Sequence, residues 1–95
     1  TVKNCYNIGN VTGNGKYVGG VVGQNFSTVE NCYNTGNVTG NSSVGGVVGQ
    51  NDGTVENCYN TGNIDATGEY VGGVIGYNNG TAENCYSKIV PPTVI

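Results

Sequence analysis

Short runs of β-branched and aromatic residues alternate with clusters of glycine and asparagine along the chain. In the most regular part of the sequence these runs occupy residues 28–34, 36–39 and 44–49. No window places apolar residues on one face of a helix, and each glycine would cost a helix roughly 1 kcal/mol. The pattern therefore predicts strands of about four to seven residues and no helix.

The same pattern recurs along the chain with a nearly constant period. Aligned on a Cys-Tyr pair that occurs once in each unit, the repeats span 1–27, 28–53, 54–80 and, as a partial unit, 81–87. Residues 88–95 depart from the repeat, and Pro91-Pro92 is expected to end strand pairing. We interpret this last stretch as a terminal segment or linker.

Units of this size bury too little apolar surface to fold alone, whereas stacking them pairs every strand with its copy and buries a continuous core. The sequence therefore predicts an all-β fold, a single-stranded parallel β-solenoid of about three coils of 26–27 residues with three short strands per coil. The general rule for parallel crossovers makes it a right-handed β-helix. An antiparallel hairpin in each repeat, turning at residues 34–37, is the second-ranked alternative because Gly and Asn suit such turns.

In a stacked solenoid, a residue type repeated at one position of the unit forms a row of like side chains. Four such rows are the predicted core: Val2, Val29, Val55 and Ala82; Val11, Val38 and Ile64; Val18, Val44 and Val71; Val22, Val48 and Ile75. The last two rows are expected to share one face. On the opposite face, Gly19, Val21 and Gly23 are expected to leave a nearly bare backbone that another surface could approach closely.

Asparagine recurs where the predicted strands should bend. Because asparagine tolerates left-handed backbone angles and bonds the adjacent main chain, two sets are assigned to these bends. The sets are Asn10, Asn37 and Asn63, and Asn25, Asn51 and Asn78. In stacked turns their side-chain amides are also expected to bond to each other.

Composition narrows the function classes. The chain has no His, Trp or Met, its three basic residues are Lys3, Lys16 and Lys88, and its net charge is −3. Three scattered lysines cannot neutralise a phosphate backbone, so a nucleic-acid partner is excluded. Without histidine the usual general base is missing, and we expect a protein that is not an enzyme. No apolar run is long enough for a membrane span, and residue 1 opens the chain without a signal-peptide pattern, so any such signal is expected to have been removed or to lie outside this sequence.

One cysteine recurs in each unit, as Cys5, Cys32, Cys58 and Cys85. Stacked one per coil, the first and last would lie roughly 14 Å apart, whereas a zinc ion needs its sulfurs within about 4 Å of one another. We therefore predict no metal and no cofactor, and favour a core ladder of free thiols. Disulfides between neighbouring coils stay open as an alternative, although parallel side chains hold the Cβ atoms slightly too far apart.

Each cysteine is followed by a tyrosine, which a regular strand directs to the opposite face. With cysteine inside, the four tyrosines form an exposed stripe: Tyr6, Tyr33, Tyr59 and Tyr86. Such a stripe could contact a ligand, by stacking on sugar rings or by anchoring a protein. It could equally stabilise only its own strand.

Acidic residues form a further column, Glu30, Glu56 and Glu83, with Lys3 at its start. Carboxylates about 5 Å apart resemble the pair of a retaining glycosidase. A catalytic pair is unique and set in a cleft, however, so a row of identical acids is better interpreted as a solvated face. A weak calcium site at Asp52, Asp65 and Glu69 is a minor alternative.

The run VGGVVGQN at 18–25, followed by STVENCYNTGNV at 27–38, resembles the GLUG motif, a bacterial repeat. The resemblance covers nearly the whole chain in about three copies. The chain has valine where the family usually has leucine (Val21, Val47 and Val74), and cysteine where it often has serine. The resemblance implies a β-helical segment of a large secreted or surface-anchored protein, as in haemagglutinin-like adhesins and the non-catalytic regions of immunoglobulin-cleaving metallopeptidases. No catalytic residue belongs to the motif.

Together these observations favour a non-catalytic structural or adhesive repeat module, a spacer or stalk at the bacterial cell surface or outside the cell. Its expected partner is a host protein or glycan. One alternative is a carbohydrate-binding or carbohydrate-active β-helix in which the tyrosines and acids line a groove. Another is a self-assembling filament subunit, because the first and last coils present unpaired strand edges for end-to-end association.

Overall fold

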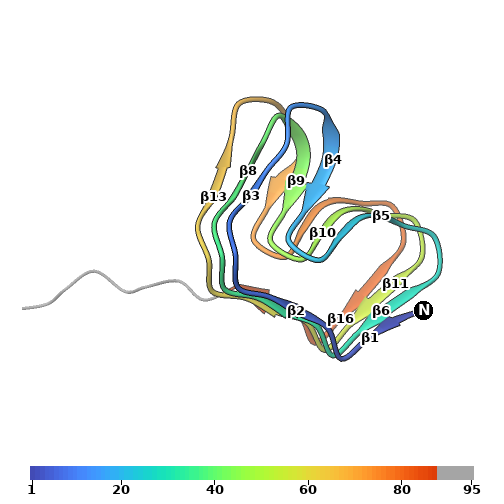
Figure 1. Cartoon of the computed structure of the whole chain (residues 1–95). Helices are drawn as coiled ribbons and strands as arrows, with labels where there is room; N and C mark the ends of the chain where they lie inside the picture. The colour runs from blue at the N-terminus through green and yellow to red at the C-terminus, as the bar shows by residue number, and fades with distance from the viewer. Residues whose placement is uncertain (88–95) are drawn as a thin grey trace, which may run out of the picture.

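The chain is wound into a stack of coils in which each strand pairs with its counterpart in the next coil (Figure 1). The structure, a computed structural model, describes residues 1–87. Within them it has no helix, and every strand pairing is parallel. The parallel β-solenoid of about three coils predicted from the repeat is therefore confirmed. The expected end of strand pairing at Pro91-Pro92 lies outside the described residues.

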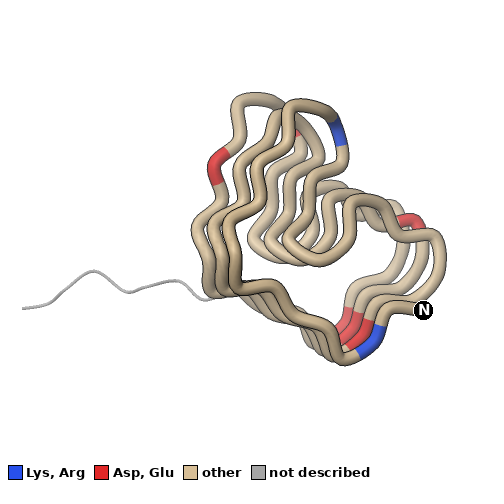
Figure 2. Tube along the Cα trace, in the orientation of Figure 1, with Lys and Arg blue, Asp and Glu red and all other residues tan. Residues whose placement is uncertain are grey.

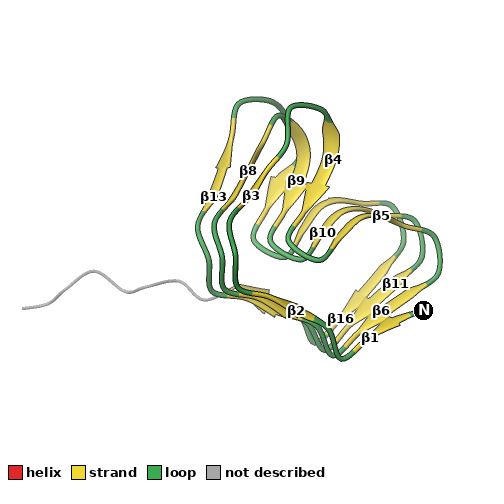
Figure 3. Cartoon of the chain, viewed as in Figure 1, coloured by secondary structure: helices red, strands yellow, loops and turns green. Residues whose placement is uncertain are grey.

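Five parallel sheets run along the stack, and each is named here by its first strand (Figure 3). The β1 sheet contains β1 (Val2–Lys3), β6 (Thr28–Glu30), β11 (Thr54–Glu56) and β16 (Thr81–Glu83). The β2 sheet contains β2 (Tyr6–Asn7), β7 (Tyr33–Asn34), β12 (Tyr59–Asn60) and β17 (Tyr86–Ser87).

The other three sheets have three strands each. The β3 sheet contains β3 (Val11–Thr12), β8 (Val38–Gly40) and β13 (Ile64–Ala66). The β4 sheet contains β4 (Lys16–Gly19), β9 (Ser42–Gly45) and β14 (Val71–Gly72). The β5 sheet contains β5 (Val22–Asn25), β10 (Val48–Asn51) and β15 (Ile75–Asn78).

Pairing is in register with the sequence repeat. Val29 lies opposite Val55, and Asn34 opposite Asn60. Because Asn34 belongs to a parallel pair, the alternative antiparallel hairpin at residues 34–37 is wrong.

Each coil contains five strands where three were predicted. The first predicted run, 28–34, is broken because Asn31 adopts a left-handed backbone with φ of 55°. This conformation turns the chain between β6 and β7. Equivalent asparagines do the same in the other coils: Asn4 (φ 56°), Asn57 (φ 55°) and Asn84 (φ 51°).

The left-handed positions therefore differ from those predicted. Four of them are the asparagines that follow β1 and its copies. The other three are Tyr17, Ser43 and Tyr70, which lie where the second repeat is one residue shorter than the first and third. The sets that contain Asn37 and Asn51 are not among them. Asparagine tolerates left-handed angles without requiring them, so its presence alone did not locate these turns.

Apolar side chains form two separate cores rather than one. The larger contains Val29, Cys32, Val47, Val48, Val55, Cys58 and Val74. The smaller contains Val18, Val38 and Val44. The predicted central positions of the four valine rows are fully buried, whereas Val71 and Ala82, nearer the end of the stack, are exposed.

The predicted facing of the third run, 44–49, was wrong. Val44 belongs to the smaller core and Val48 to the larger, and Val47 is fully buried instead of flanking a bare face. The reason is a bend at Gly46 that separates β9 from β10, so the two-residue alternation cannot be counted across it.

The close backbone approach predicted for the glycine-rich face does occur, between neighbouring sheets of this chain. A Cβ atom on Gly45 would overlap the carbonyl oxygen of Val48, and one on Gly49 would lie 2.7 Å from the backbone nitrogen of Val18. A Cβ atom on Gly46 would overlap both Gly73 and the side-chain amide of Asn60. Figure 1 shows this bend pointing into the coil, toward the β2 sheet.

Gly46→Ala should therefore lower the free energy of unfolding by about 3 kcal/mol or more, because backbone on one side and a buried amide on the other must shift. Gly15→Ala is the matched control, since a Cβ there meets nothing within 4 Å. Urea unfolding of both variants measures the difference. Equal stability of the two variants would contradict the packing described here.

Candidate functional site

Equivalent side chains of successive coils form four ladders along the stack: asparagines, cysteines, tyrosines and acids. These ladders contain the polar, aromatic and nucleophilic side chains that could bind a partner or take part in a reaction.

The first asparagine ladder runs through the interior beside the inward bend. The Nδ2 of Asn7 donates to Oδ1 of Asn34 at 2.8 Å, and the Nδ2 of Asn34 donates to Oδ1 of Asn60 at 2.8 Å. Asn34 is fully buried, and it also bonds the backbone of Gly36 through both its nitrogen and its oxygen. Its amide therefore has one partner in its own coil and one in a neighbouring coil at both the nitrogen and the oxygen.

A second amide ladder follows the β5 sheet. Asn25 donates to Asn51 at 2.8 Å, and Asn51 donates to Asn78 at 2.9 Å. Amide-to-amide bonding is therefore confirmed for this set. It is wrong for the exposed set, where the Oδ1 of Asn10 instead accepts from the backbone N–H of Asn37 at 3.1 Å.

The buried role of Asn34 was missed at the sequence level. Asn34 lies two residues after the inward Cys32, so strand alternation already placed it on the inner face. The sequence analysis assigned asparagine to bends and therefore did not apply this alternation to Asn34.

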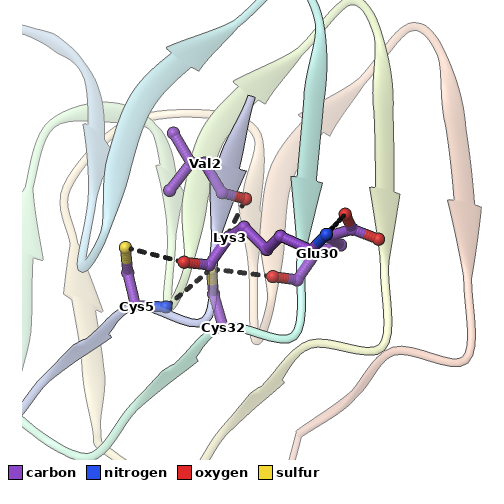
Figure 4. A network of polar contacts seen from close by, with 5 residues as sticks. All are labelled: Val2, Lys3, Cys5, Glu30 and Cys32. Carbon is purple, nitrogen blue, oxygen red and sulfur yellow. Dashed lines mark hydrogen bonds and ion pairs between the residues drawn. The ribbon is translucent and has the colours of Figure 1, made fainter.

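The four cysteines are free thiols at increasing depth toward the middle of the stack. Cys5 is exposed, Cys85 is half-buried, and Cys32 and Cys58 are fully buried. Each sulfur lies near the carbonyl oxygen two residues before it, as for Cys32 and Glu30 at 3.2 Å (Figure 4). The Cys32 thiol is a second donor to the carbonyl of Glu30, which also accepts from the backbone N–H of Asn4 at 3.1 Å.

Burial controls the chemistry of these thiols. It raises the pKa of Cys32 and raises that of Cys58 to about 11. A thiol that stays protonated at neutral pH is a poor nucleophile and a poor metal ligand, so the inner pair acts as packing.

The tyrosine ladder lies on the outer face of the β2 sheet. Neighbouring ring centroids are 5.2, 4.9 and 5.3 Å apart, and the rings are within 9° of parallel. Tyr6 and Tyr86, at the two ends, are 61% and 60% exposed, while Tyr33 and Tyr59 are half-buried. The faces of the inner rings cover one another, so these two tyrosines offer solvent chiefly their edges and hydroxyl groups.

The acidic column crosses the β1 sheet from coil to coil, at the last residue of each strand (Figure 2). Lys3 pairs with Glu30 across a 3.5 Å Nζ–Oε1 distance, and in-register pairing continues to Glu56 and Glu83. Hydrogen bonding with Glu30, followed by burial and the charges of both neighbouring acids, raises the pKa of Glu56. Among residues 1–87, an ion pair is formed only at the Lys3 end of the column.

Asp52, on the loop after β10, accepts hydrogen bonds from Gln50 at 3.0 Å and Asn79 at 3.2 Å, and these bonds lower the pKa of its carboxyl group. Asp65 and Glu69 do not join it in a metal-binding group. Among residues 1–87, no three His, Cys, Asp or Glu side chains are placed to hold a metal ion.

The described part of the chain contains no pocket. No helix within residues 1–87 is long and apolar enough to cross a membrane.

The stacked coils and their repeated ladders define a class, the repeat proteins built as parallel β-solenoids. The family model of the GLUG motif matches residues 14–39, 40–65 and 67–95. These matches cover most of the chain, and the chain therefore belongs to the GLUG-motif family. Its model starts each repeat at the loop before β4 or its copies, whereas the units above start at the β1 sheet, but the period is the same. Comparison with curated proteins and with solved structures found no match.

The cysteine ladder leads to a test by alkylation. In the native chain at neutral pH, Cys5 should react with iodoacetamide readily, whereas Cys32 and Cys58 should react only after unfolding. Burial keeps the reagent from the inner sulfurs, and their raised pKa lowers the fraction of reactive thiolate. Peptide mass spectrometry over time gives the rate at each site. In denaturant all four should react at similar rates, and native labelling of Cys58 as fast as Cys5 would contradict the buried ladder.

Proposed function

We propose that the chain is a non-catalytic spacer or stalk module of a bacterial surface or secreted protein. The GLUG-motif family supports the cellular setting. The observation that carries the proposal is that the inward side chains contact the neighbouring coils of the same chain.

Three kinds of direct interaction join one coil to the next. Asn34 bonds its copies above and below, Val47 packs in the larger core, and Tyr33 stacks between two other tyrosines. A structure organised this way gains length by adding equivalent coils without redesigning the interior. That property suits a spacer whose length is set by repeat number.

The carbohydrate alternative depends on the tyrosine ladder. Sugar rings stack on the flat faces of aromatic side chains, and the parallel stacking of Tyr33 and Tyr59 covers those faces. The exposed ring edges and hydroxyls suit a protein partner better, and we propose them as the adhesive surface of the module. Glycan-array binding that is lost on replacing Tyr33 and Tyr59 would instead favour the carbohydrate alternative.

Inserting copies of residues 28–53 should lengthen the module by roughly 4.8 Å per coil while keeping it stiff. With donor and acceptor fluorescent domains fused to the two ends, the distance derived from single-molecule energy transfer should rise in even steps and keep a narrow distribution. A glycine-serine insert of equal residue number is the matched control, and it should give broad distributions. Broad distributions for the added coils, or no change in distance, would contradict a spacer role.

A further inference from the structure

We propose that the outer surface around Tyr33 and Tyr59 binds a basic, arginine-bearing peptide segment of a partner protein, with the acidic column beside the tyrosines holding the cationic groups. This inference rests on the proposed function and deepens it, because it names the chemistry of the partner that the tyrosine surface holds. Three observations support it.

The first observation is that tyrosines and acids lie next to each other on the outside of the same coils. Glu30 ends β6 and Tyr33 begins β7, and the left-handed Asn31 makes the turn between them. The same order, Glu56 and then Tyr59, recurs in the next coil in register with the first. Both of these coils lie between two others, so the acids and tyrosines form a continuous strip along the stack.

The second observation is the charge of this strip. All six acidic residues of the chain lie between positions 17 and 87, a stretch without Lys, Arg or His. Glu56 lies between Glu30 and Glu83 in the parallel register, and like charges directly opposite are destabilising. Hydrogen bonding with Glu30, followed by burial and the neighbouring charges, raises the pKa of Glu56 accordingly. A cation from a partner relieves this repulsion, so the strip is electrostatically complementary to a basic segment.

The third observation is what the stacked tyrosines leave open to a partner. The ring centroids of Tyr33 and Tyr59 are 4.9 Å apart and the rings are within 3° of parallel, so their faces cover one another. The hydroxyl groups remain, and a tyrosine hydroxyl can accept a hydrogen bond as well as donate one. A guanidinium has five N–H donors, enough to bond a carboxylate and a hydroxyl together, whereas a lysine ammonium is a compact point charge. The strip therefore favours arginine over lysine.

Binding of this kind depends on several contacts in a row. The column supplies one carboxylate for each coil, at the rung spacing of roughly 4.8 Å. A single ion pair at a protein surface contributes little, because solvent screens it and both side chains lose freedom. The affinity should therefore rise with the number of arginines in the partner segment and fall as salt is added.

The test is fluorescence polarisation with short labelled peptides in which arginine, lysine or glutamate alternates with glycine. At low ionic strength the arginine peptide should bind the chain, and the lysine peptide should bind roughly two- to tenfold more weakly. The glutamate peptide should not bind, and added salt should weaken binding of the arginine peptide. An arginine peptide that binds no more tightly than the glutamate peptide would overturn the proposal.

Two double variants with the same change in net charge locate the binding surface. Glu30→Gln/Glu56→Gln removes two charges from the strip and should weaken binding of the arginine peptide roughly three- to thirtyfold. Asp65→Asn/Glu69→Gln is the matched control, because it removes two charges from β13 and the loop after it. The control should change the affinity less than about twofold. Equal losses for both variants would show that net charge alone attracts the peptide, and would overturn the proposal.

A third variant tests the tyrosines without removing their rings. Tyr33→Phe/Tyr59→Phe keeps the stacked rings and should weaken binding of the arginine peptide roughly two- to tenfold through the lost hydroxyls. Unchanged binding would overturn their part in the site. A tyrosine variant that loses binding while the glutamine variant keeps it would leave the adhesive surface standing and overturn the basic partner. Circular dichroism checks that all variants are folded. Failure of the spacer role shows separately, in the energy-transfer distances of added coils.

Discussion

The structure depends on one requirement, that a side-chain amide buried between coils must find its hydrogen-bond partners in the coils above and below. An unsatisfied buried polar group costs about 1–3 kcal/mol, a large share of the stability of a small domain. Asn34 meets this requirement through Asn7 and Asn60. A slip of one residue would break both bonds, so the amide ladder reinforces the register that the buried valine rows also specify.

The inward glycine bend follows from the same ladder. Gly46 lies against the backbone of Gly73 and the amide of Asn60, where a Cβ atom has no room. The bend brings the main chain down onto the ladder and separates the smaller core around Val44 from the larger one around Val48. The interior asparagine row can therefore pack against the main chain at Gly46 only because this residue has no side chain.

Much of this architecture could be predicted from the sequence, because the repeat itself encodes stacking. The period placed Val29 over Val55, and alternation along a strand placed Tyr33 outside and Cys32 inside. Alternation failed where it was counted across a bend, as at Gly46. The parallel stacking of the tyrosine rings, which decides what the stripe can bind, depends on side-chain geometry that strand alternation does not specify.

Urea unfolding of Asn34→Ala beside Asn37→Ala tests the central claim most directly. The two residues are of one type and three positions apart, but Asn34 is buried in the ladder and Asn37 is exposed. Removing the first amide takes one hydrogen bond from each of the side chains of Asn7 and Asn60 and two from the backbone of Gly36. It should cost about 2–4 kcal/mol, against less than about 1 kcal/mol for the second. Equal losses for both variants would show that the amide ladder does not hold the coils together.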